Sequence, residues 1–105
     1  MNPLIALVLP VAFACTATTA LAAGNYNTPL ASDKQFASCI AYLNAHYEGG
    51  TAASPVRGQS KAQAFCTCVW NETPENFKGS LAKFAESTKG KVINTICEKY
   101  SDWVN

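Results

Sequence analysis

AFCTCVW, residues 64–70, places two cysteines one residue apart among large apolar side chains. The segment is apolar on more than one side, which predicts a central helix with neighbours on two flanks. Successive residues of a helix are rotated by about 100° around its axis, so Cys66 and Cys68 point roughly 200° apart. Two side chains that diverge in this way do not bond to each other, and each needs a partner elsewhere in the chain.

Residues 1–23 have the composition of a secretory signal peptide. They carry no charged side chain, are apolar from Leu4 to Ala14 and end in small residues, so we expect cleavage after Ala22 or Ala23. The uninterrupted apolar run is shorter than the roughly 20 residues that span a bilayer. We therefore predict an exported chain with no stable membrane insertion after cleavage.

Cys15 lies in the same leader, after small residues, as a lipid-attachment cysteine does in bacterial lipoproteins. Phe13 is bulky where such signals usually carry a small residue, which argues against lipidation. The expected location is the periplasm or the medium, without a lipid anchor.

The mature part carries four cysteines, and an even number in an exported chain predicts disulfides. Cys39 lies 27 residues before Cys66, and Cys97 lies 29 residues after Cys68, which leaves room for one helix, a loop and a return on each side. We favour the pairs Cys39–Cys66 and Cys68–Cys97, but Cys39–Cys68 with Cys66–Cys97 fits almost equally well. Each bridge contributes roughly 3.5 kcal/mol by loop-closure entropy, which matters in a domain of only about 80 residues.

Helical periods predict an all-α fold, a small disulfide-stapled bundle of about four helices. Residues 24–31 have no period and predict a mobile arm, and residues 32–105 form a single domain. Capping boxes at 32–35 and 60–63 predict the starts of the first two helices. Glycines 49–50 and the small polar residues after them predict a loop between these helices.

Two further helices are expected in the second half of the chain. Thr73 and Pro74 have the residue types of a helix N-cap and first turn, which predicts the third start. The fourth helix shows the clearest period, with one apolar face whose members are Val92, Ile93, Ile96, Cys97, Tyr100 and Trp103 or Val104.

The charged side chains are balanced, eight basic against seven acidic, and no segment concentrates one sign. We therefore expect neither a nucleic-acid partner nor an anionic membrane surface. His46 is the sole histidine, and the chain has no Gly-x-Ser-x-Gly motif to accompany it. We predict that the protein is not an enzyme and needs no cofactor; a small hydrolase that uses His46 is the third hypothesis.

Metal binding is the main alternative, because Cys66-x-Cys68 with further thiolates suits zinc or monovalent copper. Export into an oxidising compartment favours disulfides instead. The candidate partner-binding residues are Tyr26 in the arm, Trp103 near the C-terminus and a solvent-facing His46. We expect both aromatic side chains to be exposed, and exposed aromatic residues are typical anchors for a protein partner.

The order Phe-x-x-Cys at 36–39, Phe-Cys-x-Cys-Val at 65–69 and a late Cys97 resembles small exported bacterial proteins with four cysteines, mostly of unknown function. In size, leader, helices and disulfides the chain is more loosely similar to periplasmic immunity proteins that neutralise type VI secretion effectors. The resemblance carries over no site residue. With the missing catalytic motif, it implies a secreted or periplasmic non-catalytic protein that acts by protein–protein contact, as inhibitor, immunity or accessory factor.

Overall fold

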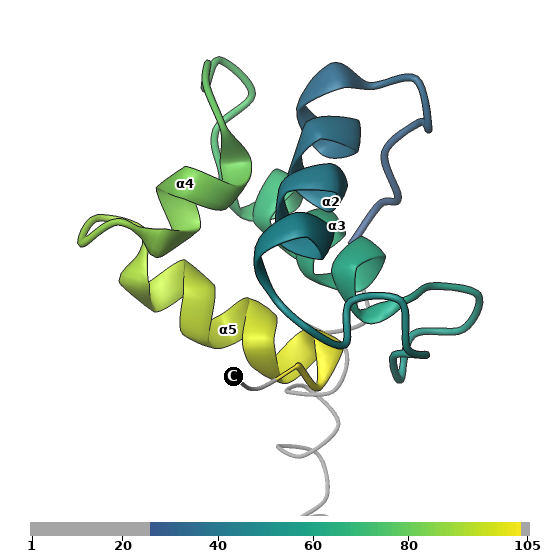
Figure 1. The fold of residues 1–105 in the computed structure, drawn as a ribbon. Coiled ribbons are helices and arrows are strands. Elements are labelled where there is room, and N and C mark those ends of the chain that lie inside the picture. Colours follow the sequence, from purple (N-terminus) through teal and green to yellow (C-terminus); the bar gives the residue numbers. More distant parts are fainter. Residues whose placement is uncertain (1–25, 104–105) are drawn as a thin grey trace, which may run out of the picture.

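The computed structural model describes residues 26–103, so the predicted signal peptide, Cys15, residues 24–25 and Val104 lie outside the described residues. The fold is all-α and has four helices over this range, as the sequence predicts (Figure 1). The helices are α2 (Lys34–His46), α3 (Lys61–Glu72), α4 (Leu81–Glu86) and α5 (Lys91–Ser101).

Helix α3 is the centre of the domain and packs against α2, α4 and α5. Its buried residues run almost without interruption from Ala62 to Val69, because neighbours cover more than one of its sides. The structure has the first of the two cysteine pairings: Cys39 of α2 is bonded to Cys66, and Cys68 to Cys97 of α5. Each of the two outer helices is therefore bonded covalently to α3.

The start of α3 is capped in two ways. Ser60 Oγ accepts from the amide of Gln63, and the Gln63 side chain accepts from the Ser60 amide, which confirms the predicted capping box. The loop between α2 and α3 adds two acceptors, since the carbonyls of Gly50 and Ala52 bind the amides of residues 62 and 61 at 2.9 and 2.8 Å. This loop therefore closes the helix end that carries both staple cysteines.

Two predicted helix starts are wrong. Asp33, not Ser32, caps α2, and its carboxylate accepts from the Phe36 amide at 2.9 Å. Thr73 does not open a helix but ends α3, where its amide donates to Val69 O at 3.1 Å. The next helix begins only after Ser80, whose hydroxyl accepts from the Lys83 amide. The observed caps, Asp33 and Ser80, are both of residue types preferred at helix N-caps. The rejected candidates, Ser32 and Thr73, are of the same types, so residue type alone does not identify the cap.

The buried face of α5 is narrower than the apolar face of its sequence. Cys97 and Ser101 are fully buried, whereas Val92 is 71% and Ile96 40% exposed. The bond from Cys97 to Cys68 turns the Cys97 side of the helix toward α3, so side chains about 100–140° away from it, such as Ile96 and Val92, reach solvent. Val92 and Ile96, one turn apart, therefore form an exposed apolar pair.

Helices α4 and α5 meet at a tight turn that requires glycine. A Cβ on Gly90 would lie 1.9 Å from the carbonyl oxygen of Phe84, a distance that no side chain tolerates. The turn keeps the end of α4 against the start of α5.

Residues 26–31, which belong to the segment predicted as a mobile arm, pack on the domain in the structure. The backbone of Asn27 exchanges two hydrogen bonds with the Asn71 side chain, at 3.2 and 2.8 Å. Thr28 accepts from Gln59, and Pro29 is buried. Polar contacts with residues more than thirty positions away hold the arm, and they leave no local period in the sequence.

Thr67, between the two staple cysteines, is fully buried and its hydroxyl has no hydrogen-bond partner. Because an unpaired buried hydroxyl costs free energy, we expect Thr67→Val to raise the free energy of unfolding by about 1 kcal/mol. Urea denaturation with the disulfides intact measures the change. Thr95→Val is the control at an exposed helix position. A lower stability for Thr67→Val, with Thr95→Val unchanged, would contradict this reading of the core.

Candidate functional site

The main cleft of the described residues opens between the C-terminal end of α2, helix α4 and helix α5, and has a volume of about 550 Å³. That volume falls within the range of ligand and side-chain pockets. Its walls come from three helices whose relative positions depend on the staples, and Phe65 of α3 closes it from below. We take this cleft as the candidate binding site.

Three aromatic rings form the floor of the cleft. Trp103 packs edge-on against Phe65, with ring centroids 6.1 Å apart, and against Tyr47, at 6.2 Å. The Trp103 indole N–H donates to the carbonyl of Glu48 at 2.9 Å, so the ring is fixed at its polar end as well. The floor is therefore held in one position before any ligand arrives.

The prediction that Trp103 is exposed is wrong: its exposed fraction is 4%. Helix α5 ends at Asp102, which has a left-handed backbone (φ 55°) and donates its amide to the carbonyls of Glu98 and Lys99. Aspartate adopts this conformation more readily than most residues. The turn folds Trp103 back over α3 instead of continuing the helix into solvent.

Glu86, at the end of α4, forms the rim of the cleft. Its carboxylate accepts from the Tyr42 hydroxyl at 3.0 Å and from the Tyr47 hydroxyl through its other oxygen. The hydrogen bond to Glu86, followed by burial, raises the pKa of Tyr47 to about 12, and the same bond raises the pKa of Tyr42. Sequence analysis missed all three residues, because no local pattern links positions 42, 47 and 86.

The α5 wall carries Lys91, Asn94 and Glu98, which recur at three- and four-residue spacing and so share one side of the helix. Glu98 is half-buried. Within residues 26–103 its carboxylate receives no hydrogen bond, and only its backbone carbonyl is engaged, by Trp103 and Ser101. This wall therefore presents one cation, one amide and one carboxylate, and the carboxylate can accept hydrogen bonds from a ligand.

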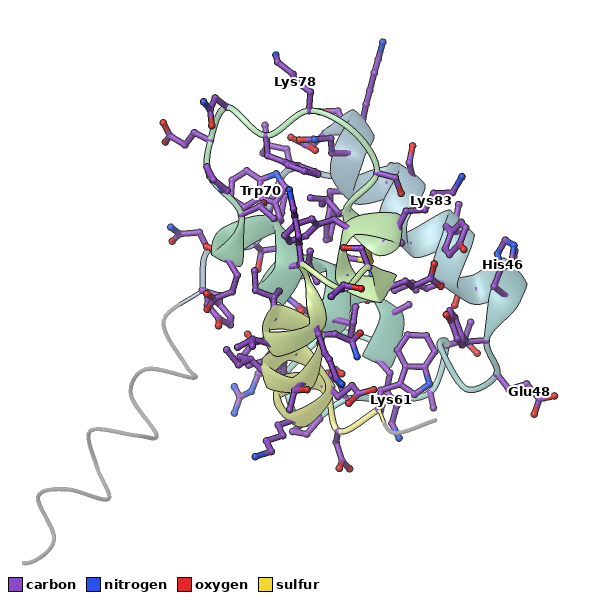
Figure 2. The ribbon with its side chains drawn as sticks, turned by 90° about the vertical axis from the view of Figure 1, so that its left-hand side faces the viewer. His46, Glu48, Lys61, Trp70, Lys78 and Lys83 are labelled. Atoms are coloured by element: carbon purple, nitrogen blue, oxygen red, sulfur yellow. A yellow bond between two sulfur atoms is a disulfide. The ribbon has the colours of Figure 1, made fainter. Side chains whose placement is uncertain are left out.

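His46 lies next to this rim and is exposed. Its ring stacks on Tyr42 with centroids 4.0 Å apart, and Nδ1 lies 2.9 Å from the Tyr42 carbonyl oxygen. Figure 2 shows His46 and Glu48 extending from the same end of the domain, well away from Trp70. Within the described residues no serine hydroxyl is hydrogen-bonded to His46. Of the three candidate residues, Trp103 lines the cleft, and His46 does not line it but is connected to the carboxylate at its rim through Tyr42.

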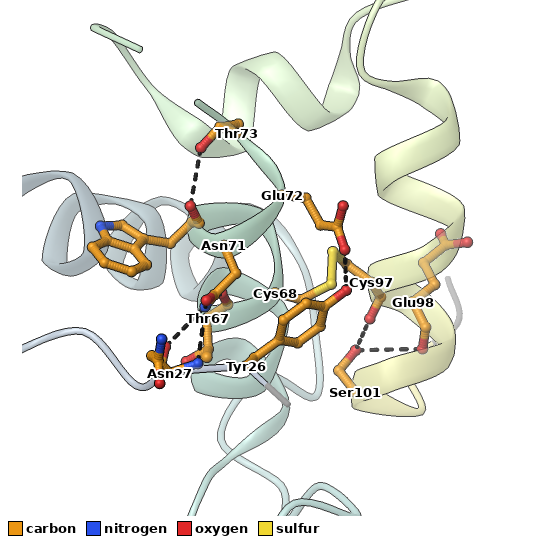
Figure 3. Close-up of a disulfide and its surroundings, with 11 residues drawn as sticks. Tyr26, Asn27, Thr67, Cys68, Asn71, Glu72, Thr73, Cys97, Glu98 and Ser101 are labelled. Carbon is orange, nitrogen blue, oxygen red and sulfur yellow. Dashed lines mark hydrogen bonds between the residues drawn. A yellow bond between two sulfur atoms is a disulfide. The ribbon is translucent and has the colours of Figure 1, made fainter. Parts of the chain in front are cut away.

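Tyr26, the third candidate, lies beside Glu72 and the Cys68–Cys97 disulfide (Figure 3). It is half-buried, its ring packs edge-on against Tyr100 at 4.8 Å, and its hydroxyl donates to the Glu72 carboxylate. Burial, followed by the bond to Glu72, raises the pKa of Tyr26. Its contacts are those of a residue that docks the arm, and it does not line the cleft.

The four candidate cysteines are all in disulfides and at most 1% exposed. A disulfide sulfur is not a thiolate and does not serve as the metal ligand that the Cys66-x-Cys68 alternative needs. Between residues 26 and 103, no three His, Cys, Asp or Glu side chains cluster to hold a metal. Closed disulfides indicate an oxidising compartment outside the cytoplasm. None of the helices over residues 26–103 is both long and apolar enough to cross a membrane.

Comparison of the chain with protein-family models, curated proteins and solved structures gives no significant match. The function therefore has to be argued from the cleft and its residues.

The bridging pattern is tested by counting thiols in a chain produced without residues 1–23, and so without Cys15. We expect the protein, unfolded without reductant, to react with no alkylating reagent, and to react at four cysteines after reduction. Peptide mapping should join Cys39 to Cys66 and Cys68 to Cys97. Free thiols that retain a stoichiometric metal would support the metal-binding alternative instead.

The rim is tested through the ionisation of Tyr47. Glu86→Gln keeps an acceptor but removes the charge, so we expect the pKa of Tyr47 to fall from about 12 toward its ordinary 10.0. Because the folded-state pKa is raised, this contribution to stability is complete below pH 10 and is lost as pH rises toward 12. Tyrosine ring ¹³C NMR follows each residue separately. Glu72→Gln is the control, and it should affect Tyr26 alone; an unchanged Tyr47 in Glu86→Gln would rule out this rim geometry.

Proposed function

We propose that the protein is a periplasmic or secreted, non-catalytic binding protein that holds another protein through the cleft between α2, α4 and α5. The function class is an inhibitor, immunity or accessory factor. The observation that carries the proposal is the construction of the cleft: an ordered aromatic floor, a polar rim, and three walls of which two, α2 and α5, are bonded to α3 by disulfides.

Preorganisation supports a binding role. Association costs free energy when side chains and loops have to be ordered at the interface. Here Trp103 is already fixed at its ring and at its indole N–H, and Glu86 is already fixed by two tyrosines. The residues that would meet a partner therefore lose little freedom when it binds.

The chemistry of the cleft supports a protein partner rather than a reaction. Interface cores are enriched in aromatic residues and surrounded by a polar rim, which matches rings at the base and Glu86, Lys91 and Asn94 at the edge. His46, the only histidine, is engaged with Tyr42 through stacking and through Nδ1. No described nucleophile is placed beside it.

The experiment is affinity capture from the extracytoplasmic protein fraction of the organism that makes the chain. The bait is the disulfide-bonded mature protein, compared with Asn94→Trp, which fills the cleft from the α5 wall. Thr95→Trp is the matched control, because Thr95 is exposed on α5 and does not line the cleft. We expect one protein to be retained by the wild type and by Thr95→Trp and to be reduced at least tenfold with Asn94→Trp.

Circular dichroism and thiol counting show that both variants keep the fold. Retention of the same protein by all three baits would place the binding surface elsewhere. Loss with both tryptophan variants would implicate α5 as a whole rather than the cleft.

A further inference from the structure

We infer that the cleft accepts a basic side chain of the protein partner, with arginine preferred over lysine. This inference rests on the proposed function and specifies the chemistry of the group that enters the site.

The charges around the cleft favour a cation. Glu86 and Glu98 stand on two different walls, α4 and α5, and Lys91 is the one basic residue among the lining residues. A cation between the two carboxylates interacts with both, whereas a carboxylate from a partner would face two like charges against one opposite charge. Lys91, at the N-terminal end of the α5 wall, repels a cation in the cleft and should weaken its binding. Removal of the Lys91 charge should therefore strengthen the binding of a cation.

The hydrogen-bonding capacity of the rim favours a donor. A carboxylate offers about four acceptor sites, and Glu86 uses one on each oxygen for Tyr42 and Tyr47. The hydrogen bonds to Glu86 raise the pKa values of both tyrosines, so these hydroxyls stay protonated and donate to the Glu86 carboxylate. Glu98 adds a carboxylate that no hydrogen bond within residues 26–103 engages. The carboxylates of Glu86 and Glu98 therefore both keep accepting capacity for a donor from a partner.

The floor distinguishes arginine from lysine. A guanidinium group is planar, is weakly hydrated, stacks on aromatic rings and presents a fork of N–H donors to carboxylates. Among the lining rings, the half-buried Tyr47 offers the surface for such stacking, and the buried Trp103 supports it edge-on. A lysine ammonium has three donors and can reach both carboxylates, but it is a compact, strongly hydrated charge with no planar face to stack and no fork that binds one carboxylate through two parallel bonds.

The test is an NMR titration of the intact, disulfide-bonded protein with N-acetyl-arginine amide, N-acetyl-lysine amide, N-acetyl-glutamine amide and N-acetyl-glutamate amide. The chain has two tryptophans, which provide two indole N–H signals. Trp103 lines the cleft, and Trp70 lies apart from it and serves as an internal reference. We expect saturable shifts of the Trp103 signal with the arginine compound at about 10 mM, weaker shifts with lysine, and none with glutamine or glutamate.

Variants that remove one charge test whether that charge strengthens or weakens binding of the arginine compound. Glu98→Gln should weaken arginine binding about threefold, and Lys91→Gln should strengthen it about twofold, as expected for partly exposed ion pairs. Glu75→Gln and Lys83→Gln remove the same charges outside the cleft and should change nothing. Added salt should weaken arginine binding to the wild type.

Equal shifts with arginine and glutamine, a larger response to glutamate, or no response of Trp103 to any compound would overturn the inference. The proposed function fails separately. If Asn94→Trp abolishes capture of the partner while Glu98→Gln and Lys91→Gln leave it unchanged, the cleft binds a protein but not through a cation. If the arginine compound binds as expected but Asn94→Trp leaves capture unchanged, the cleft recognises cations and the captured partner docks elsewhere.

Discussion

The divergence of two cysteines on one helix is the constraint on which the rest of the structure depends. Cys66 and Cys68 leave α3 on different sides and bond to Cys39 of α2 and Cys97 of α5. The two bonds fix how α2 and α5 are rotated as well as where they lie. Rotation about α5 decides that Lys91, Asn94 and Glu98 face the cleft while Val92 and Ile96 face solvent. A different pairing would turn the outer helices and give another set of walls.

Features encoded by neighbouring residues could be predicted from the sequence. The all-α class, the central position of the Cys-x-Cys helix and the Ser60–Gln63 capping box are of this kind, since each depends on periodicity or on residues three apart. Competition between neighbouring caps caused the errors. Ser32 stands beside Asp33, and Thr73 with Pro74 precedes Ser80, so propensity alone offered two starts for one helix. Packing and the end of α3 selected between them.

The cleft could not be predicted, because its parts meet only through tertiary contacts. Glu86 joins two tyrosines about forty residues earlier, and Trp103 reaches a carbonyl 55 residues away. The prediction that Trp103 is exposed failed for a physical reason that can be identified. A helical period carried through residue 102 puts its ring in solvent, whereas a single left-handed residue, Asp102, puts it in the floor of the cleft. A change of one backbone conformation thus converts a predicted surface anchor into a buried support.

The two disulfides also explain why the chain tolerates residues that do not favour the folded state. Each bridge contributes roughly 3.5 kcal/mol, and the two together are comparable to the whole stability of an ordinary small domain. A chain stabilised in this way tolerates an exposed Val92, a buried Thr67 hydroxyl without a partner, and carboxylates gathered at one cleft. Residues that do not favour the folded state are expected at functional positions. Glu86 is bonded to two tyrosines and so contributes to stability, whereas no hydrogen bond within residues 26–103 engages the Glu98 carboxylate. Under the proposed binding function, the placement of Glu98 beside the aromatic floor serves recognition rather than stability.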